Sequence, residues 1–166
     1  MKLIVLSLFF VCISIFAFAT TYSVTNTNDS GTGSLREAIS QANLSSVGSD
    51  IIQFAIDNDD PNYDAESGVF TIALNSELPL ISSAFITIDG NTQQSLTGNT
   101  NTDGPEIRIF GGGTLEYGFR VGGPSNTFKN LIIAGFEYGF QFYGTYAYSN
   151  VIENNYIGTT YDGVSA

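Results

Sequence analysis

Apolar residues recur in short runs along most of the chain. Residues 51–54, 70–74 and 85–88 are rich in β-branched and aromatic side chains, and Asp, Asn, Gly or Pro bounds each run. Short apolar runs between turn-forming residues are typical of β-strands. We therefore predict strands in these three segments and an earlier one at residues 22–24.

One segment has the hydrophobic spacing of a helix. After the turn formers of residues 25–33, Ser34 and Glu37 are spaced as a capping box, in which each side chain accepts a hydrogen bond from the other residue's backbone N–H. The apolar positions that follow share one helical face: Leu35, Ala38, Ile39 and Ala42. Asn43 ends the pattern, and no later segment is predicted to be helical. We expect Leu35 and Ile39 to cover the open N-terminal end of the β-structure.

The chain repeats itself at a spacing of 21 residues. Residues 85–90 resemble residues 106–111, and residues 117–121 resemble residues 138–142. In each pair the apolar positions alternate in the same way, so the same face is buried in successive repeats. We therefore expect Ile86 to stack above Ile107, and the other alternate members to follow: Ile88 above Ile109, Phe119 above Phe140 and Val121 above Phe142.

A third pair has a spacing of 20, residues 130–132 with residues 150–152. In the first of these we expect Leu131 to be buried, together with Ile133. Asn130 and Asn150 are expected at turns, where stacked amides can hydrogen-bond along the axis of the repeats.

Two repeat architectures have periods near 21 residues. A leucine-rich repeat needs its own leucine register and a helical return segment, and neither is visible after residue 51. A parallel β-helix needs several short strands in each coil, joined by turns such as residues 111–113, 122–124 and 143–145. The repeats favour the second: an all-β solenoid of coils of about 21 residues with one N-terminal capping helix.

The first nineteen residues have the features of a secretory signal peptide. Lys2 precedes an uncharged apolar run over residues 3–18, and Ala17 and Ala19 are the small residues of a cleavage site. The run is shorter than the roughly 20 residues that span a bilayer, and Thr20 ends it. We predict a signal peptide at residues 1–19, a strand and capping helix at 20–50, and β-coils at 51–166 that continue past the C-terminal end of the sequence. The protein is then secreted or held at the cell surface, with no membrane span after cleavage.

Charge and composition exclude several classes of function. The chain has 16 acidic and 5 basic residues, a net charge of -11, so it lacks the clustered cations that bind nucleic acids. It has no His, and Cys12 is its single cysteine. Zinc sites, nucleophiles paired with His and disulfide scaffolds are therefore excluded.

The basic residues that follow the signal peptide are expected to be solvent-exposed charges that keep the protein soluble. Arg36 lies in the capping helix, and Arg108, Arg120 and Lys129 lie on the coils, with both arginines on outward faces. Two acidic residues, Asp89 and Asp162, precede glycines and are interpreted as turn residues.

Two loops are candidates for Ca²⁺. Residues 99–104 place oxygen donors at positions one, three and five and Gly at six, as in a calcium loop, but Phe110 stands where a bidentate Glu belongs. The second loop is an acidic stretch over residues 57–66, whose loose spacing and Pro61 also fit a solvated insertion. Neither loop supplies the six or more oxygens that Ca²⁺ takes.

Aromatic residues gather between Tyr117 and Tyr148 and invite a carbohydrate-stacking interpretation. We place the phenylalanines of this group in the core and the tyrosines along a surface groove: Phe119, Phe140 and Phe142 in the first set, and Tyr117, Tyr138, Tyr143, Tyr146 and Tyr148 in the second.

The N-terminal third carries a family resemblance. Residues 33–39, with 24–31 before them and 51–54 after them, resemble the N-terminal region of secreted right-handed parallel β-helix repeat proteins with a CSLREA-type motif, although Gly33 replaces the motif's Cys. Residues 154–163 resemble a coil segment common in those proteins. The resemblance implies a right-handed β-helix of the pectin-lyase-like superfamily, which includes lyases, hydrolases and adhesins, so fold does not decide function.

The leading functional hypothesis is the capped N-terminal part of a secreted or cell-surface protein, a non-catalytic module for adhesion or glycan contact. The alternative is a polysaccharide lyase or glycoside hydrolase of the same superfamily, which two carboxylates and one Arg or Lys on one outward sheet face would indicate. A third, a structural solenoid without a ligand, differs from the first only by experiment. No catalytic, cofactor-binding or metal-binding residue is assigned. Carbohydrate is the expected partner, and self-association through an open C-terminal end is expected.

Overall fold

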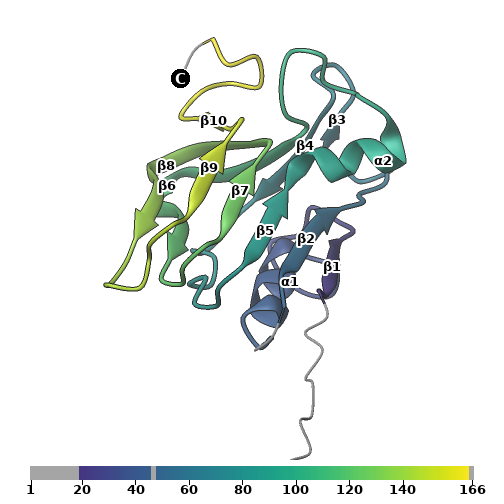
Figure 1. Ribbon diagram of the computed structural model, residues 1–166. Coiled ribbons are helices and arrows are strands. Elements are labelled where there is room, and N and C mark those ends of the chain that lie inside the picture. Colours follow the sequence, from purple (N-terminus) through teal and green to yellow (C-terminus); the bar gives the residue numbers. More distant parts are fainter. Residues whose placement is uncertain (1–18, 46–47, 165–166) are drawn as a thin grey trace, which may run out of the picture.

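The computed structural model describes residues 19–45 and 48–164 (Figure 1). The predicted signal peptide, apart from Ala19, lies outside the described residues. The elements in chain order are β1 Thr21–Val24, α1 Leu35–Ala42, β2 Asp50–Phe54, β3 Tyr63–Asp64, β4 Val69–Ala73, β5 Ile86–Asp89, the 3₁₀-helix η1 Gly90–Gln93, α2 Gln94–Thr97, β6 Ile107–Val121, β7 Thr127–Lys129, β8 Leu131–Phe142, β9 Val151–Glu153 and β10 Tyr156–Ile157. Neither helix in this part of the chain has the length and apolarity to cross a bilayer.

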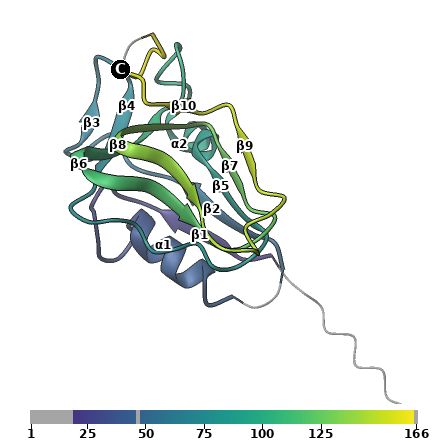
Figure 2. The same ribbon diagram turned by 90° about the vertical axis from the view of Figure 1, so that its left-hand side faces the viewer.

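The strands form two five-stranded sheets. The first has the order β1-β2-β5-β7-β9 and is parallel throughout. The second has the order β10-β8-β6-β4-β3 and is parallel except for β3, which is antiparallel to β4. The two sheets lie face to face, and α1 covers the end at β1 and β2 (Figures 1 and 2).

The hydrophobic core lies between the sheets. It joins alternate residues of the first sheet, such as Ile52 and Ile88, to alternate residues of the second, such as Ile109 and Phe119, all with no exposed surface. A strand with one buried face has this period of two. The predicted strands at residues 22–24, 51–54, 70–74 and 85–88 are confirmed within one or two residues.

The helix at the N-terminal end is also confirmed. Ser34 caps α1, and its Oγ accepts from the backbone N–H of Glu37 at 3.2 Å. The reciprocal bond differs by one residue, because the Glu37 carboxylate accepts from Gly33 N at 2.7 Å rather than from Ser34. Leu35 and Ile39 have no exposed surface and belong to the core.

The predicted fold class is wrong. The chain forms a mixed α/β arrangement of two five-stranded sheets with helices α1 and α2, not an all-β, right-handed parallel β-helix with a single capping helix. The described residues show no solenoid of regular 21-residue coils: paired strands are separated by 21 residues at Tyr117 and Tyr138 but by 40 at Thr87 and Thr127. The helices η1 and α2, also missed, lie within one of the long connections.

One of the predicted stacks is present and another is not. Tyr117 pairs with Tyr138, and the residues beyond them pair as expected. Ile86 and Ile107, however, lie in different sheets and contribute to the same core from opposite sides. Alternation in the sequence shows that a strand has a buried face, but it does not show to which sheet the strand belongs.

The predicted amide contact between Asn130 and Asn150 is wrong, because the Asn130 amide donates to Asp89 Oδ1 at 2.9 Å instead. Asn126, not Asn130, contacts Asn150: its backbone N–H donates to Asn150 Oδ1 at 2.8 Å. The Asn126 side chain is fully buried, and its Oδ1 accepts from Ile86 N at 2.8 Å. The burial pattern around Leu131 also differs, because Ile132 is buried together with Leu131 and Ile133.

Candidate functional site

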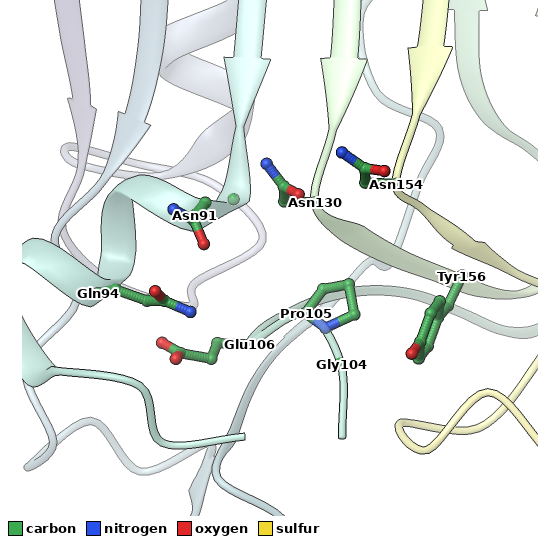
Figure 3. A pocket seen from close by; sticks show the side chains of 9 residues that line it. Asn91, Gln94, Gly104, Pro105, Glu106, Asn130, Asn154 and Tyr156 are labelled. Atoms are coloured by element: carbon green, nitrogen blue, oxygen red, sulfur yellow. The ribbon is translucent and has the colours of Figure 1, made fainter. Parts of the chain in front are cut away.

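A pocket of about 320 Å³ lies where three parallel strands of the first sheet end (Figure 3). Gly90, Asn130 and Asn154 directly follow β5, β7 and β9, and they form one wall of the pocket. Gly104 and Pro105, which precede β6, and Tyr156 of β10 form the opposite wall. Because parallel strands in register end at the same edge, segments far apart in sequence meet at this corner.

The wall at the strand ends depends on particular backbone geometries. A Cβ at Gly90 would lie 1.9 Å from the carbonyl oxygen of Asn130, so only glycine fits between the two corners. Asn130 and Asn154 have φ values of 57° and 55°. Asparagine tolerates this left-handed conformation better than most residues, which explains its place at two stacked corners.

Glu106 forms the floor of the pocket and is 2% exposed. Its Oε1 accepts from Thr100 N at 2.8 Å. Its Oε2 is buried and has no hydrogen-bond partner among the described residues. A buried carboxylate oxygen without a partner is costly, so the site needs a donor or a cation at this point.

Free side-chain amides surround Glu106. Within residues 19–45 and 48–164, the amides of Asn91, Gln94 and Asn154 make no hydrogen bond, and all three line the pocket. By contrast, the buried side-chain amide of Gln93, which precedes Gln94, has partners for both of its ends. It accepts from Ile56 N at 2.9 Å and donates to Ile56 O at 2.7 Å. The chain therefore separates structural amides from amides that are open to a ligand.

A second depression, of about 460 Å³, lies over β6 and β8. Glu116 and Glu137 line it from neighbouring strands, and both are exposed. Four residues farther along the same strands, Arg120 donates to Gln141 Oε1 at 3.0 Å. Two carboxylates and an arginine thus project from one pair of strands, the arrangement that the lyase or hydrolase hypothesis requires.

The surroundings of these groups favour a structural role for the arginine. Arg120 also lies 3.5 Å from Glu77 Oε2. Paired carboxylates act as acid and base when their environments differ strongly, usually through the burial of one of them. Glu116 and Glu137 share the same exposed setting.

The aromatic group divides between core and surface differently from the prediction. Phe119 is buried and stacks on half-buried Phe140 at 5.6 Å, but Phe142, expected in the core, is 45% exposed. Five exposed rings follow one another along the end of β8 and the loop after it: Tyr138, Phe142, Tyr143, Tyr146 and Tyr148. We call these five residues the aromatic surface. It lies at the opposite ends of the strands from the pocket (Figure 1).

Nearby carboxylates affect two of the tyrosines. The pKa of the Tyr117 phenol is raised, mainly by the Glu116 carboxylate, and that of Tyr138 is raised mainly by Glu137. In both cases the main cause is a hydrogen bond to the carboxylate, which only the protonated phenol can donate, and the negative charge of the carboxylate adds to it. Tyr117 and Tyr138 stack with their ring centroids 5.6 Å apart.

The basic residues of the described chain each contact a neighbouring side chain, although the buried Nε of Arg108 has no hydrogen-bond partner among the described residues. Arg36 contacts Asp29, and Lys129 Nζ lies 3.3 Å from Asp89 Oδ2. The Arg108 guanidinium lies 4.2 Å from the centre of the Phe110 ring, and its partial burial lowers the pKa of this group. The cations therefore stabilise the fold locally rather than gather at one site.

The two calcium candidates use their oxygens internally. In residues 99–104, Asn101 Oδ1 accepts from Asp103 N at 3.1 Å. In the acidic stretch, Asp57 and Asp64 each accept from a backbone N–H two residues later, at 3.1 Å. The described residues contain no group of three acidic side chains placed to hold a metal ion.

Asp89 and Asp162, each followed by a glycine, serve as local caps, in keeping with their interpretation as turn residues. Asp89 caps η1, because its Oδ1 accepts from Asn91 N at 3.0 Å. Asp162 Oδ1 accepts from Val164 N at 3.0 Å, and Gly163 has a φ of 74°.

The pocket residues could not be recognised from the repeat pattern. Glu106 belongs to the pattern only as part of a repeat, and the pattern pairs Asn130 with Asn150 instead of Asn154. The available signal was an Asn or Gly directly after each apolar strand, at positions 90, 130 and 154. Their unequal spacing hid this signal from a search for a constant period.

Comparisons of the chain with models of protein families, with curated proteins and with solved structures found no match. The resemblance of residues 33–39 to the CSLREA-type motif therefore stays a prediction.

Proposed function

We propose that the protein is a secreted or cell-surface module without catalytic activity, which contacts neutral glycans through its aromatic surface. The observation that carries this proposal is the run of five rings that are 45–72% exposed, from Tyr138 to Tyr148. Rings of this kind offer apolar faces to the C–H groups of a sugar, and tyrosine hydroxyls add hydrogen bonds.

Charge supports a neutral rather than an anionic glycan. The chain has a net charge of -11, and exposed Glu137 is next to Tyr138 on β8. An anionic polysaccharide such as pectate is therefore repelled at physiological ionic strength, whereas a neutral one is not. Secretion is supported by the sequence of residues 1–19.

The test is binding of immobilised neutral and anionic oligosaccharides to the purified chain. We expect neutral glycans to bind, and Tyr146→Ser and Tyr148→Ser each to weaken binding about threefold to tenfold, the scale for loss of one aromatic contact. Tyr161→Ser is the matched control, because Tyr161 is also exposed but lies beyond β10. Binding that is unchanged in both loop variants, or equal loss in the control, would contradict the proposal.

Glu116 and Glu137 support a second candidate, a glycoside hydrolase. They line one depression on neighbouring strands, and a pair of carboxylates is what glycoside hydrolysis uses. Release of reducing ends from a neutral polysaccharide, abolished by Glu116→Gln or Glu137→Gln, would favour the hydrolase over the non-catalytic module.

For the lyase we expect a negative result with pectate and alginate. Calcium-dependent formation of an unsaturated product that absorbs in the ultraviolet, abolished by Arg108→Ala or Arg120→Ala, would contradict this expectation and favour the lyase.

A further inference from the structure

We propose that the pocket at the ends of β5, β7 and β9 binds a single sugar ring, with Glu106 as the group that accepts hydrogen bonds from its hydroxyls. The ligand class rests on the proposed function, but the pocket itself does not. It is a second site, separate from the aromatic surface.

Glu106 identifies the chemistry that the ligand must supply. One carboxylate oxygen is held by Thr100 N, whereas the other is buried at the pocket floor without a partner among the described residues. The missing partner must donate a hydrogen bond, and a bond to a charged acceptor is about twice as strong as one between neutral groups. A hydroxyl group is such a donor.

The rim identifies the rest of the ligand. The free amides of Asn91, Gln94 and Asn154 each offer both a donor and an acceptor. A hydroxyl also both donates and accepts, so several hydroxyls on one ring match several amides. A single metal ion would contact only the oxygens of these amides and would not use their N–H groups.

Size and rigidity agree with a molecule rather than an ion. The cavity of about 320 Å³ lies at the lower end of the range of small-molecule sites. Its far wall is fixed, because the Tyr156 hydroxyl donates to Asp103 O at 2.7 Å. A Cβ at Gly104 would lie 2.4 Å from the Tyr156 ring, so glycine allows the loop to pack against this wall.

The experiment measures binding of D-glucose, D-galactose, D-mannose and N-acetyl-D-glucosamine to the full chain by saturation-transfer NMR and calorimetry. We expect at least one of them to bind. Glu106→Gln keeps the shape and the oxygen that accepts from Thr100 N but places a donor where the free acceptor was. It should weaken binding at least about tenfold, since a hydrogen bond to a charged group is lost. Asn91→Ala should weaken it about threefold to tenfold.

Glu66→Gln and Asn91→Ala distinguish a sugar contact in the pocket from a general effect of charge or of folding. Glu66→Gln removes the same charge from an exposed loop and should leave binding unchanged. Asn91 is exposed and its side chain makes no bond in the described structure, so Asn91→Ala tests the pocket even if Glu106→Gln fails to fold.

The outcome is decisive for this site independently of the aromatic surface. Loss of monosaccharide binding in Glu106→Gln, with glycan binding at the aromatic surface intact, supports the pocket proposal. Absence of binding by all four sugars overturns it, as does binding that both pocket variants retain. Calcium binding that Glu106→Gln abolishes, without any sugar binding, would show a cation site instead. Loss of glycan binding in Tyr146→Ser, with monosaccharide binding unchanged, would support the aromatic surface as the glycan site and would not bear on the pocket.

Discussion

Removal of the Arg36 side chain should cost this protein more stability than removal of any other arginine in the described chain. Arg36 projects from the first turn of α1 and donates four hydrogen bonds. Its Nε binds Asp29 O at 3.0 Å, and its Nη1 binds Glu77 O at 2.6 Å. Its Nη2 binds Ser76 O at 2.8 Å and Asp29 Oδ1 at 2.6 Å. The guanidinium thereby ties the helix to the preceding loop and to a second loop about 40 residues farther along the chain.

The magnitude follows from these contacts. Arg36→Met keeps much of the apolar stem but leaves three main-chain carbonyls and a carboxylate without their donor. Hydrogen bonds to a charged group contribute about 1.5–3 kcal/mol each, although they are not additive. The ion pair with Asp29 is largely buried, with side chains 19% and 16% exposed, so water replaces the lost donor only in part. We expect a loss of about 3 kcal/mol in the free energy of unfolding.

The matched control is Arg120→Met. Arg120 also carries one positive charge and lies near a carboxylate, but that contact is 3.5 Å long and its side chains are 36% and 33% exposed. Exposed ion pairs contribute about 0–1 kcal/mol. Both variants change the net charge equally, so their difference isolates the contacts of Arg36 from the overall charge of the chain.

Equilibrium unfolding in urea, followed by far-ultraviolet circular dichroism, measures both variants. With a denaturant slope of about 2 kcal/mol/M, the midpoint should fall by about 1.5 M for Arg36→Met and by less than about 0.5 M for Arg120→Met. Arg36→Lys should lie between Arg36→Met and the parent, because an ammonium group keeps the charge but loses the planar fork that reaches all four acceptors. Equal midpoints for Arg36→Met and Arg120→Met would refute the reasoning.

Three other predictions concern the helix, the tyrosines and the open sheet edges. Leu35→Asp should lower the free energy of unfolding by about 3 kcal/mol or more, because it places a carboxylate at a fully buried site; a melting curve like the parent's would contradict this. Tyr117 and Tyr138 should ionise above the ordinary phenol pKa. Their contribution to the free energy of unfolding is therefore present below the ordinary pKa and declines as the pH rises through the raised values. Glu116→Gln should shift the appearance of phenolate absorbance to lower pH, and an unchanged titration would contradict the role of Glu116. Because β9 and β10 are edge strands with exposed apolar side chains, the chain should self-associate or lose amide protection first in these strands. Val151→Lys should reduce the association. Light scattering that shows a monomer at all concentrations, with the amides of β9 exchanging as slowly as those of β5, would contradict the prediction.

The local elements follow from patterns over a few neighbouring residues. The α1 helix follows from Ser34, Glu37 and the apolar stripe at Leu35 and Ile39, because capping and amphipathic spacing involve only residues within a few positions of one another. The early strands follow from the same kind of short-range pattern. The 21-residue match of Tyr117 with Tyr138 also corresponds to a real pairing, since β6 and β8 are adjacent and similar along that stretch.

Tertiary structure decided which strands pair and where polar groups meet. Ile86 and Ile107 have the pattern expected of stacked residues, yet they face each other across the core, because alternation carries no information about sheet membership. The connections between paired strands vary in length, and one contains η1 and α2, which no strand period predicts.

The pocket also depends on contacts between residues that are distant in sequence. Glu106 has an ordinary acidic side chain in the sequence, and its unpartnered oxygen exists only because Thr100 folds back onto it and the ends of β5, β7 and β9 close over it. Arg36 likewise looks like an ordinary helix residue in the sequence, but in the fold it binds three main-chain carbonyls from two loops. Interactions between residues close in sequence determine the helix and the strands. Hydrogen bonds that span 40 or more residues determine what Arg36 and Asn130 do: Arg36 binds the carbonyls of Ser76 and Glu77, and the Asn130 amide donates to Asp89.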